Sequence, residues 1–244
     1  MAETSFRFRQ FTVHQDKCAM KVGTDAVLLG SWVRTSYADR ILDIGTGTGV
    51  IALMLAQRTE AMIDAIDIDP GACQQAKENF RISPWFLRLH IQECPLQQFA
   101  ETAEFRYDLI VSNPPYFQHT PKSDDSSRST ARNAEHLPYL ELIAGVKKLL
   151  LPNGRFCVIL PFKEGMQFMD LAQSNGLFCH RLARVRTVAD KPEKRVMMEF
   201  DQHFGLLTEE NIIIQEDDYS YSRQYIDLTK DYYFDLKGAR PTTL

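Results

Sequence analysis

Four consecutive residues in the middle of the chain have groups suited to holding an amino nitrogen. Asn113 and Pro114 each offer a carbonyl acceptor, and the prolines Pro114 and Pro115 restrict the backbone to an extended form. Two acceptors aimed at one point can hold both hydrogens of an sp² amino group and direct the nitrogen lone pair at a methyl donor. Tyr116 adds a flat face on which a planar substrate could stack. We predict these four residues to be catalytic; the alternative is a proline-rich turn.

A glycine-rich loop upstream predicts a cofactor site. Asp43 is followed by Gly45, Gly47 and Gly49, at the end of one expected strand and the start of one expected helix. Glycines let the backbone turn tightly and let a ligand approach the main chain. The spacing is not the G-x-G-x-x-G of dinucleotide folds, and an acid at the mouth would repel a pyrophosphate. It would suit a ligand with an ammonium group and no phosphate.

Two further acids follow the next expected strands. Asp67 ends one strand and could accept hydrogen bonds from both hydroxyls of a ribose. Glu93 follows the third strand and could accept from the exocyclic amine of an adenine, the alternative being a solvated loop acid. Asp69 is better explained as a helix N-cap before Pro70. A nucleoside with an amino-acid tail satisfies this set, so we predict S-adenosylmethionine as the cofactor.

The elements that must position these residues alternate between strands and helices. Such alternation predicts an α/β, doubly wound, mostly parallel sheet, and two late strands joined by a turn predict an antiparallel hairpin at its edge. An irregular segment, 117–135, is expected as a lid. The expected strands are 40–44, 62–67, 86–92, 107–112, 155–160, 178–188 and 195–204, and the expected helices are 25–33, 50–58, one opening at Pro70, 137–150 and 166–175.

Composition bounds the class of protein. The 244 residues, 44% apolar and 25% charged, are typical of one soluble globular domain. The longest apolar runs are too short to span a membrane, and the N-terminus lacks the apolar core of a signal peptide. Five scattered cysteines without a CxxC pair indicate reduced thiols in the cytoplasm, and no histidine or cysteine cluster predicts a metal site.

The net charge of −4 at first disfavours a nucleic-acid partner. Its distribution changes that conclusion. Residues 201–235 hold nine acids against two basic residues, a net −7, which leaves +3 for the rest of the chain. We therefore expect a mildly basic body that binds nucleic acid transiently.

At these motifs the chain resembles class I S-adenosylmethionine-dependent methyltransferases with a Rossmann-like, seven-stranded sheet. More narrowly, it resembles the family of bacterial tRNA1(Val) (adenine(37)-N6)-methyltransferases over nearly its whole length. The narrower resemblance rests on Gln10-Phe11, Met20-Lys21-Val22-Gly23-Thr24-Asp25, Leu28-Leu29-Gly30-Ser31-Trp32, the glycine loop, Asn113-Pro114-Pro115-Tyr116-Phe117, Ala131-Arg132 and Tyr232-Tyr233-Phe234.

The resemblance implies methyl transfer to N6 of adenine 37 in the anticodon loop of a valine tRNA. It also implies that Lys21, Thr24 and Asp25 close over the methionine end of the cofactor, although Thr24 or Asp25 could instead be a helix N-cap. The chain then divides into an N-terminal extension and lid (1–39), a methyltransferase core (40–206) and an acidic C-terminal extension packed on that core (207–244). We take a monomer as the working expectation, since nothing in the sequence decides the oligomeric state.

Basic residues flanking the expected active face are candidates for contacting RNA phosphates; the alternative is a solvated face, and the Phe/Arg alternation at the N-terminus could equally be an edge strand. Two other functions stay open: another amino-nitrogen methyltransferase, acting on ribosomal RNA, DNA adenine or release-factor glutamine, and a cofactor-binding module without catalysis. The candidate RNA contacts are Arg7, Arg9, Arg132, Arg184, Arg186, Lys194 and Arg195.

Overall fold

The computed structural model describes residues 4–18, 20–114, 128–234 and 236, with only the backbone described at 128–138. Its main sheet has the strand order β10-β8-β9-β7-β6-β3-β4-β5, and only β9 runs antiparallel to its neighbours. The strands are β3 (Arg40–Ile44), β4 (Met62–Asp67), β5 (Leu89–Glu93), β6 (Tyr107–Ser112), β7 (Leu150–Pro161), β8 (Phe178–Arg186), β9 (Arg195–Asp201) and β10 (Thr208–Ile213).

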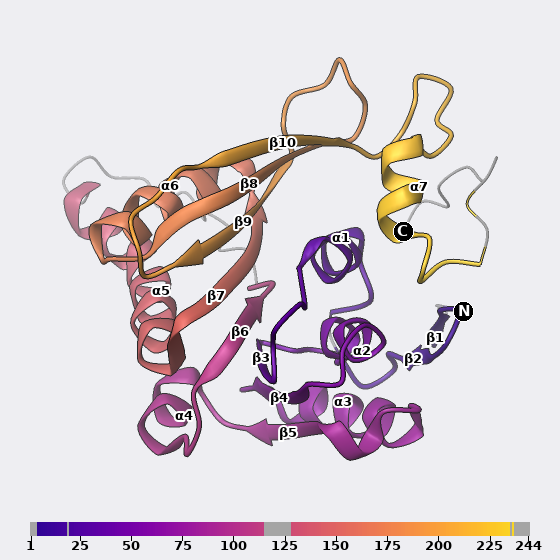
Figure 1. The fold of residues 1–244 in the computed structure, drawn as a ribbon, viewed down its shortest axis with the longest axis horizontal. Helices are drawn as coiled ribbons and strands as arrows, with labels where there is room; N and C mark the ends of the chain where they lie inside the picture. The colour runs from indigo at the N-terminus through magenta and orange to yellow at the C-terminus, as the bar shows by residue number, and fades with distance from the viewer. Residues whose placement is uncertain (1–3, 19, 115–127, 235, 237–244) are drawn as a thin grey trace.

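Helices cover both faces of this sheet, as Figure 1 shows. One side carries α1 (Thr24–Trp32), α2 (Val50–Ala56) and α3 (Pro70–Ile82), and the other carries α4 (Leu96–Thr102), α5 (Arg128–Leu149) and α6 (Phe162–Ser174). Successive strand residues point to opposite faces, so Ile41 and Leu109 join the core on the first side, while Leu42 and Ile110 join the core on the second. The predicted doubly wound architecture is confirmed.

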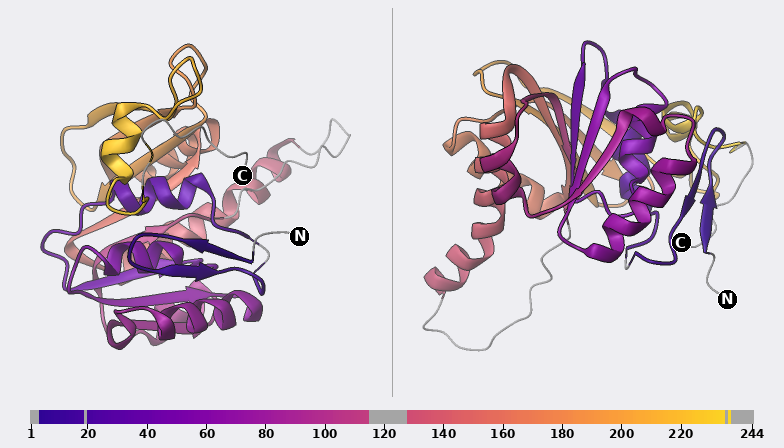
Figure 2. Two further views of the ribbon diagram at one scale, coloured as in Figure 1. Left: turned by 90° about the vertical axis from the view of Figure 1, so that its right-hand side faces the viewer. Right: turned by 90° about the horizontal axis from the view of Figure 1, so that it is seen from below.

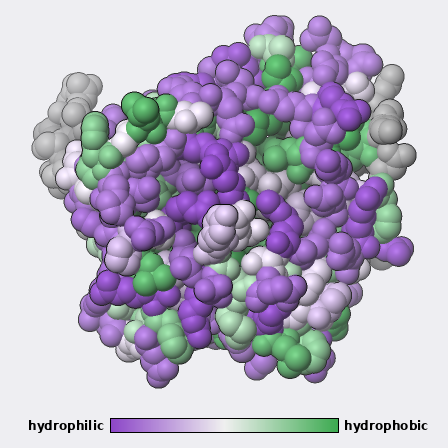
Figure 3. Space-filling view, viewed as in Figure 1, coloured by the Kyte–Doolittle hydropathy of each residue, from purple (hydrophilic) through white to green (hydrophobic). Residues whose placement is uncertain are grey.

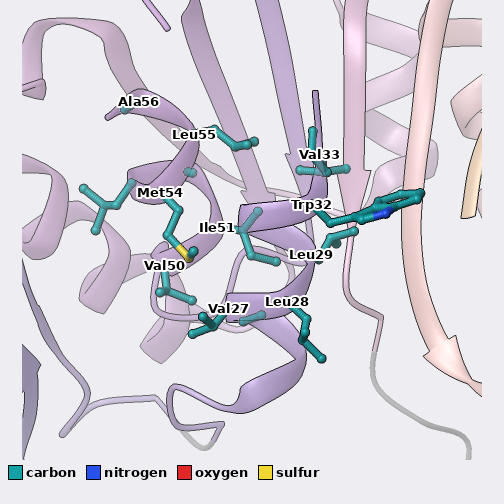
Figure 4. Packing of buried hydrophobic residues seen from close by; sticks show 14 of the residues in the cluster. Val27, Leu28, Leu29, Trp32, Val33, Val50, Ile51, Met54, Leu55 and Ala56 are labelled. Atoms are coloured by element: carbon teal, nitrogen blue, oxygen red, sulfur yellow. The ribbon is translucent and has the colours of Figure 1, made fainter. Parts of the chain in front are cut away.

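The helix α2 is buried along its whole length. It packs on the sheet beside α1, and the side chains of the two helices meet in the layer shown in Figure 4. The two helices approach closely at Gly30, where a Cβ atom would lie 2.8 Å from the sulfur of Met54. A helix that is apolar all round has to be enclosed in this way. The outer face seen in Figure 3 is by contrast mostly hydrophilic, with hydrophobic residues in small separate groups.

The sheet has eight strands and not the predicted seven. The additional strand is β10, which pairs in parallel with β8 at the edge of the sheet. Its sequence carries polar residues and buries only Ile212 fully, since one side of an edge strand meets solvent. Because the strand contains no apolar run, the sequence pattern did not predict it. The short helix α4 also lies in a stretch where no element was expected.

Several predicted boundaries also move. The third strand starts at Leu89, because Phe86–Arg88 forms a 3₁₀ turn before it. The strand β7 already begins at Leu150, with an irregular register against β6. The expected irregular segment 117–135 is helical from Arg128 onward, and its earlier part lies outside the described residues.

Both terminal segments pack on the same side of the core as α1 and α2 (Figures 1 and 2). The N-terminal segment forms a hairpin of β1 (Ser5–Arg7) and β2 (Thr12–His14), which bears out the alternative of strand structure there. The C-terminal segment contains α7 (Arg223–Thr229), and Tyr232 after it donates to the carbonyl of Met54 at 2.9 Å. Because Phe8 and Tyr232 belong to one hydrophobic cluster, the two extensions fold with the core. The exact three-part division stays a prediction.

The start of α2 depends on Gly49. This residue has a φ of 81°, and a Cβ atom placed on it would lie 2.5 Å from Cε1 of Phe80 in α3. Both facts disfavour a side chain at this position. L residues rarely adopt positive φ, and displacing an aromatic ring in a packed core costs free energy.

We predict that Gly49→Ala lowers the free energy of unfolding by about 2–5 kcal/mol, measured by urea denaturation. Gly45→Ala is the matched control, because Gly45 has a φ of 71° but no atom within 4 Å of the point where a Cβ atom would stand. The control should lose only the backbone cost of about 1–2 kcal/mol. Equal losses in the two variants would contradict the role of Phe80.

Candidate active site

A cavity of about 910 Å³ lies at the carboxyl ends of the strands, where ligands bind in doubly wound sheets. The N-terminal segment, the glycine loop, the end of β6 and the C-terminal segment all contribute to its wall. Most of the residues predicted from sequence to bind cofactor therefore meet in one place. The predicted site residues that line the cavity are Lys21, Thr24, Asp25, Gly45, Gly47, Asp67, Asn113, Pro114, Lys194 and Arg195.

The carboxylate of Asp67 holds the glycine loop. Its Oδ2 accepts a hydrogen bond from the amide of Gly47 at 2.9 Å, and its Oδ1 accepts one from the amide of Asp69 at 3.0 Å. The amide of Gly45 donates to the carbonyl of Ile66 at 2.9 Å, which fixes the loop against the end of β4. A carboxylate has about four acceptor sites, so Asp67 retains capacity for two ligand hydroxyls. Its position in the cavity wall suits the predicted ribose contact.

Asp69 behaves as expected of a helix cap. Its side chain accepts from the amide of Gly71 at 2.8 Å, and Pro70 occupies the first position of α3. This contact satisfies one of the backbone donors that a helix leaves unpaired at its N-terminus. Assignment of the ribose contact to Asp67 rather than Asp69 is consistent with this geometry.

Asp43 does not lie at the mouth of the cavity, in contrast to the sequence-based expectation. It is fully buried beneath the loop, where its Oδ2 accepts from the hydroxyl of Thr46 at 2.7 Å. Burial raises the pKa of this carboxyl to about 7, against a smaller opposing effect of the hydrogen bond from Thr46. The side chain is therefore placed to shape the loop from below, and an ammonium group in the cavity would not contact it directly.

Two other predicted residues also lie off the cavity wall. Gly49 faces Phe80 rather than the cavity. Glu93 is exposed at the end of β5, and the four residues that follow it, 94–97, line the cavity in its place. Sequence reasoning selected the carboxylate because it has obvious chemistry. Cys94 and Pro95, which follow Glu93 and line the cavity, have no side-chain group that would indicate a cofactor contact.

The segment that contributes Lys21 is tied down by Gln15, whose Oε1 accepts from the amide of Val22 at 2.9 Å. The N-cap of α1 is Gly23, without a side-chain capping bond, so the alternative role of Thr24 or Asp25 as a cap is wrong. Both side chains instead lie at the cavity wall.

Asn79 connects this N-terminal segment to the glycine loop. Its buried amide nitrogen donates to the carbonyls of His14 at 2.9 Å and Thr48 at 2.8 Å, and its oxygen accepts from the amide of His14 at 2.9 Å. One α3 side chain therefore joins the end of β2 to the glycine loop. No sequence motif announces Asn79 as a site residue, because it acts through position alone.

The start of the predicted catalytic tetrapeptide follows directly from β6. The hydroxyl of Ser112 donates to the carbonyl of Ile44 at 2.9 Å and ties the end of β6 to the end of β3, just before the glycine loop. Asn113 and Pro114 are half-buried in the cavity wall. Pro115 and Tyr116 lie outside the described residues. The first two acceptors of the motif are thus adjacent to the predicted cofactor site.

Comparison with known proteins shows the family to which the chain belongs. The family model described as methyltransferase small domain matches residues 18–178. A tRNA1(Val) (adenine(37)-N6)-methyltransferase of Bacteroides fragilis is 45% identical over 97% of this chain and 100% of its own length. Its counterpart from Trichodesmium erythraeum is 42% identical over 96% and 99%, respectively. The chain belongs to this methyltransferase family.

Solved structures show the same fold at low sequence identity. A predicted O-methyltransferase from Agrobacterium tumefaciens superposes with a TM-score of 0.68 at 17% identity, covering 85% of this chain and 96% of that one. A 16S rRNA methyltransferase from T. thermophilus, solved with AdoMet and guanosine, gives a TM-score of 0.56 at 18% identity, covering 82% and 50%. These likenesses confirm the predicted class I methyltransferase fold.

Most of the predicted cations on the hairpin of β8 and β9 are paired with acidic side chains, so their contact with RNA phosphates stays a prediction. The guanidinium of Arg184 donates to Glu209 at 2.9 Å, Arg186 pairs with Glu193, and Arg195 donates to Asp25 at 2.8 Å. Of the predicted hairpin cations, only Lys194 has no ion-pair partner among the described residues. Sequence reasoning missed this because acids distant in the chain face these arginines.

The other predicted RNA contacts lie elsewhere. Arg7 and Arg9 are exposed but engage the C-terminal segment: Arg7 lies over the ring of Phe234 at 5.1 Å, and Arg9 donates to the Phe234 carbonyl at 2.6 Å. The side chain of Arg132 lies outside the described residues. The predicted RNA-binding residues therefore do not form one continuous unpaired surface.

Three further features concern metal binding, membrane spans and disulfides. In the described part of the chain, no group of three or more histidine, cysteine or acidic side chains could hold a metal ion. No described helix is long and apolar enough to cross a membrane. All five cysteines are free.

The raised pKa of Asp43 predicts a pH-dependent stability. Between about pH 4 and 7 the unfolded chain carries an ionised Asp43 while the folded chain keeps its proton, so the free energy of unfolding should fall as pH rises. We expect a loss on the order of 3 kcal/mol across this window, which Asp43→Asn should abolish. The measurement is urea denaturation from pH 4 to 8, with Asp39→Asn, at an exposed position, as the control. Parallel pH profiles for wild type and Asp43→Asn would refute the assignment.

Proposed function

We propose that this chain transfers a methyl group from S-adenosylmethionine to N6 of adenine 37 in a valine tRNA. The observation that carries the proposal is the meeting of Asn113 and Pro114 with the glycine loop and Asp67 in one cavity. The chain also covers nearly the full length of relatives with that activity in their names. A methyl donor and an amino acceptor need such a shared space.

The residues of the cavity fit S-adenosylmethionine. Asp67 has spare acceptor capacity for the ribose hydroxyls, and the backbone of Gly45 and Gly47 leaves room for close approach of the amino-acid tail. Apolar side chains such as Ile66 and Ile68 supply contacts for a flat base. When bound, the cofactor supplies a sulfonium methyl group, which is electrophilic without a metal ion.

The chemistry asked of the chain itself is orientation and charge stabilisation. The side-chain carbonyl of Asn113 and the main-chain carbonyl of Pro114 accept the two hydrogens of the adenine amino group. These bonds turn the nitrogen lone pair out of conjugation with the ring and toward the methyl group, and they stabilise the positive charge that develops on nitrogen. The Asp43 carboxyl contributes indirectly, because it holds Thr46 in the loop below the cavity.

An anticodon-loop adenine is a suitable acceptor. Bases in single-stranded loops can be splayed out and stacked on aromatic side chains, which is the usual mode of sequence-specific RNA recognition. The choice of the valine isoacceptor rests on the names of the relatives. Five free cysteines suit a reducing compartment, so we place the reaction in the cytoplasm, with a monomer as the working form.

Asn113→Ala should lower kcat for methylation of tRNA by at least about 100-fold, because one of two acceptors for the amino group is lost. Binding of S-adenosylmethionine, measured by calorimetry, should stay within a few-fold of wild type. Activity is read with labelled S-adenosylmethionine and by nucleoside mass spectrometry of the product. Transcripts with another base at position 37 control for the site of methylation. Full activity of Asn113→Ala would eliminate the proposed role.

The pairing of the hairpin arginines predicts unequal contributions to RNA affinity. Lys194→Ala should reduce the slope of log affinity against log salt by about one, as expected for loss of one phosphate contact. Arg184→Ala should leave the slope nearly unchanged, because Glu209 already accepts from that guanidinium. Filter binding of tRNA at several salt concentrations makes the comparison. A larger slope change for Arg184→Ala than for Lys194→Ala would reverse the ranking.

A further inference from the structure

The cavity extends beyond Asn113 into a second region that the methyl transfer itself does not use. This region lies past the carboxyl ends of β8 and β10, and its wall includes Thr187, Lys194, Gln215 and Tyr221. In the sheet order, β7 and β9 lie between β6 and β8. At about 4.8 Å per strand spacing, the end of β8 lies roughly 14 Å along the sheet from the end of β6, and the start of β9, next to Lys194, lies roughly 10 Å from it. One base held at Asn113 cannot also reach it.

A short turn sets Gln215 and Tyr221 opposite each other. The two residues form an isolated antiparallel bridge, and the amide of Glu216 donates to the carbonyl of Ser220 at 2.9 Å. The amide of Gln215 donates to the carbonyl of Thr187 at 2.8 Å, which anchors the turn to the end of β8. Both side chains are therefore held on the cavity wall by backbone bonds that do not involve their polar groups.

The side chains in this region have the chemistry of a nucleotide site. The ring of Tyr221 stacks on that of Tyr225, with centroids 5.0 Å apart and planes 21° from parallel, so buried Tyr225 supports one face. Tyr221 also lines the cavity, where its ring can stack on a base. Among the described residues, the Gln215 carboxamide has no hydrogen-bond partner and the Lys194 ammonium has no ion-pair partner. An amide can pair with a base edge and an ammonium with a phosphate.

We propose that Tyr221, Gln215 and Lys194 form a subsite for a nucleotide that flanks the methylated adenosine in the RNA substrate. The proposal rests on the proposed function, since it takes the acceptor to be RNA with its target amino group at Asn113. A flanking nucleotide bound there holds the RNA backbone on the far side of the target base. The subsite thus adds affinity for an RNA chain over a free nucleoside.

The test compares RNA affinity and methylation for substitutions at two tyrosines of the same turn. Tyr221→Ala should weaken binding of an anticodon stem-loop RNA by about 5- to 150-fold, the loss expected for one stacked base. Tyr221→Phe keeps the ring and should stay within about 3-fold of wild type. Tyr219→Ala is the matched control, because Tyr219 is 66% exposed and lies off the cavity wall. Affinity for S-adenosylmethionine should be unchanged in all three.

A modified RNA makes the test specific. Stem-loops lacking the base on either side of position 37 are assayed with wild type and with Tyr221→Ala. One of the two abasic RNAs should bind wild type as weakly as the intact RNA binds Tyr221→Ala, and should lose little further in the variant. Independent, multiplicative losses for both abasic RNAs would overturn the subsite.

The outcomes separate this proposal from the proposed function. If wild type methylates adenine 37 but Tyr221→Ala binds RNA normally, only the subsite is wrong. If Tyr221→Ala weakens S-adenosylmethionine binding and leaves RNA binding intact, the region belongs to the cofactor. If wild type does not methylate adenine 37 at all, the proposed function fails. Should Tyr221→Ala not fold, Gln215→Ala replaces it, with an expected loss of about 3- to 10-fold, and wild-type RNA affinity in that variant would refute the subsite.

Discussion

The three hydrogen bonds of the Asn79 side chain hold the site together. They join His14 of the N-terminal segment to Thr48 of the glycine loop, through a residue that is itself packed in α3. A buried amide costs free energy unless its groups are paired, so the two segments it pairs with are effectively fixed in one arrangement. Lys21–Asp25 follow the first segment in the chain, and Val50 and Ile51 of α2 follow the second. These two groups of cavity-lining residues are therefore positioned by one constraint.

The ion pairs of the molecule also join residues that are far apart in the chain. The acidic C-terminal segment supplies Glu209 and Glu210, which lie beside Arg184 and Arg181 because β10 pairs with β8. The segmental charges of −7 and +3 therefore partly cancel in space. Fewer of the predicted hairpin cations are unpaired than the sequence indicated. Lys194, Gln215 and Tyr221 then matter because they lie together at the cavity, not because of the sign of the net charge.

The predicted site residues lie together in the cavity wall where local chemistry and strand order sufficed to place them. Asp67 and Asn113 end strands of a parallel sheet, and the carboxyl ends of such strands meet at one edge, so spacing alone brought them together. Sequence reasoning failed at Asp43 and Glu93, whose exposure depends on the packing around them: one is buried under the loop and the other faces solvent. Nor did it single out Tyr221, since one of three closely spaced tyrosines in a polar segment carries no periodic or motif signal of its own.

From residue types and their order one could already derive the doubly wound fold, the cofactor class and the amino-nitrogen chemistry, because glycine conformations, proline restraints and apolar strands act locally. Folding alone decided the eighth strand, the ion pairs of the hairpin arginines and the second region of the cavity. Each of these joins residues far apart in the chain. Tertiary packing sets the distances between these residues and thereby decides which side chains are paired. No local sequence pattern encodes those distances.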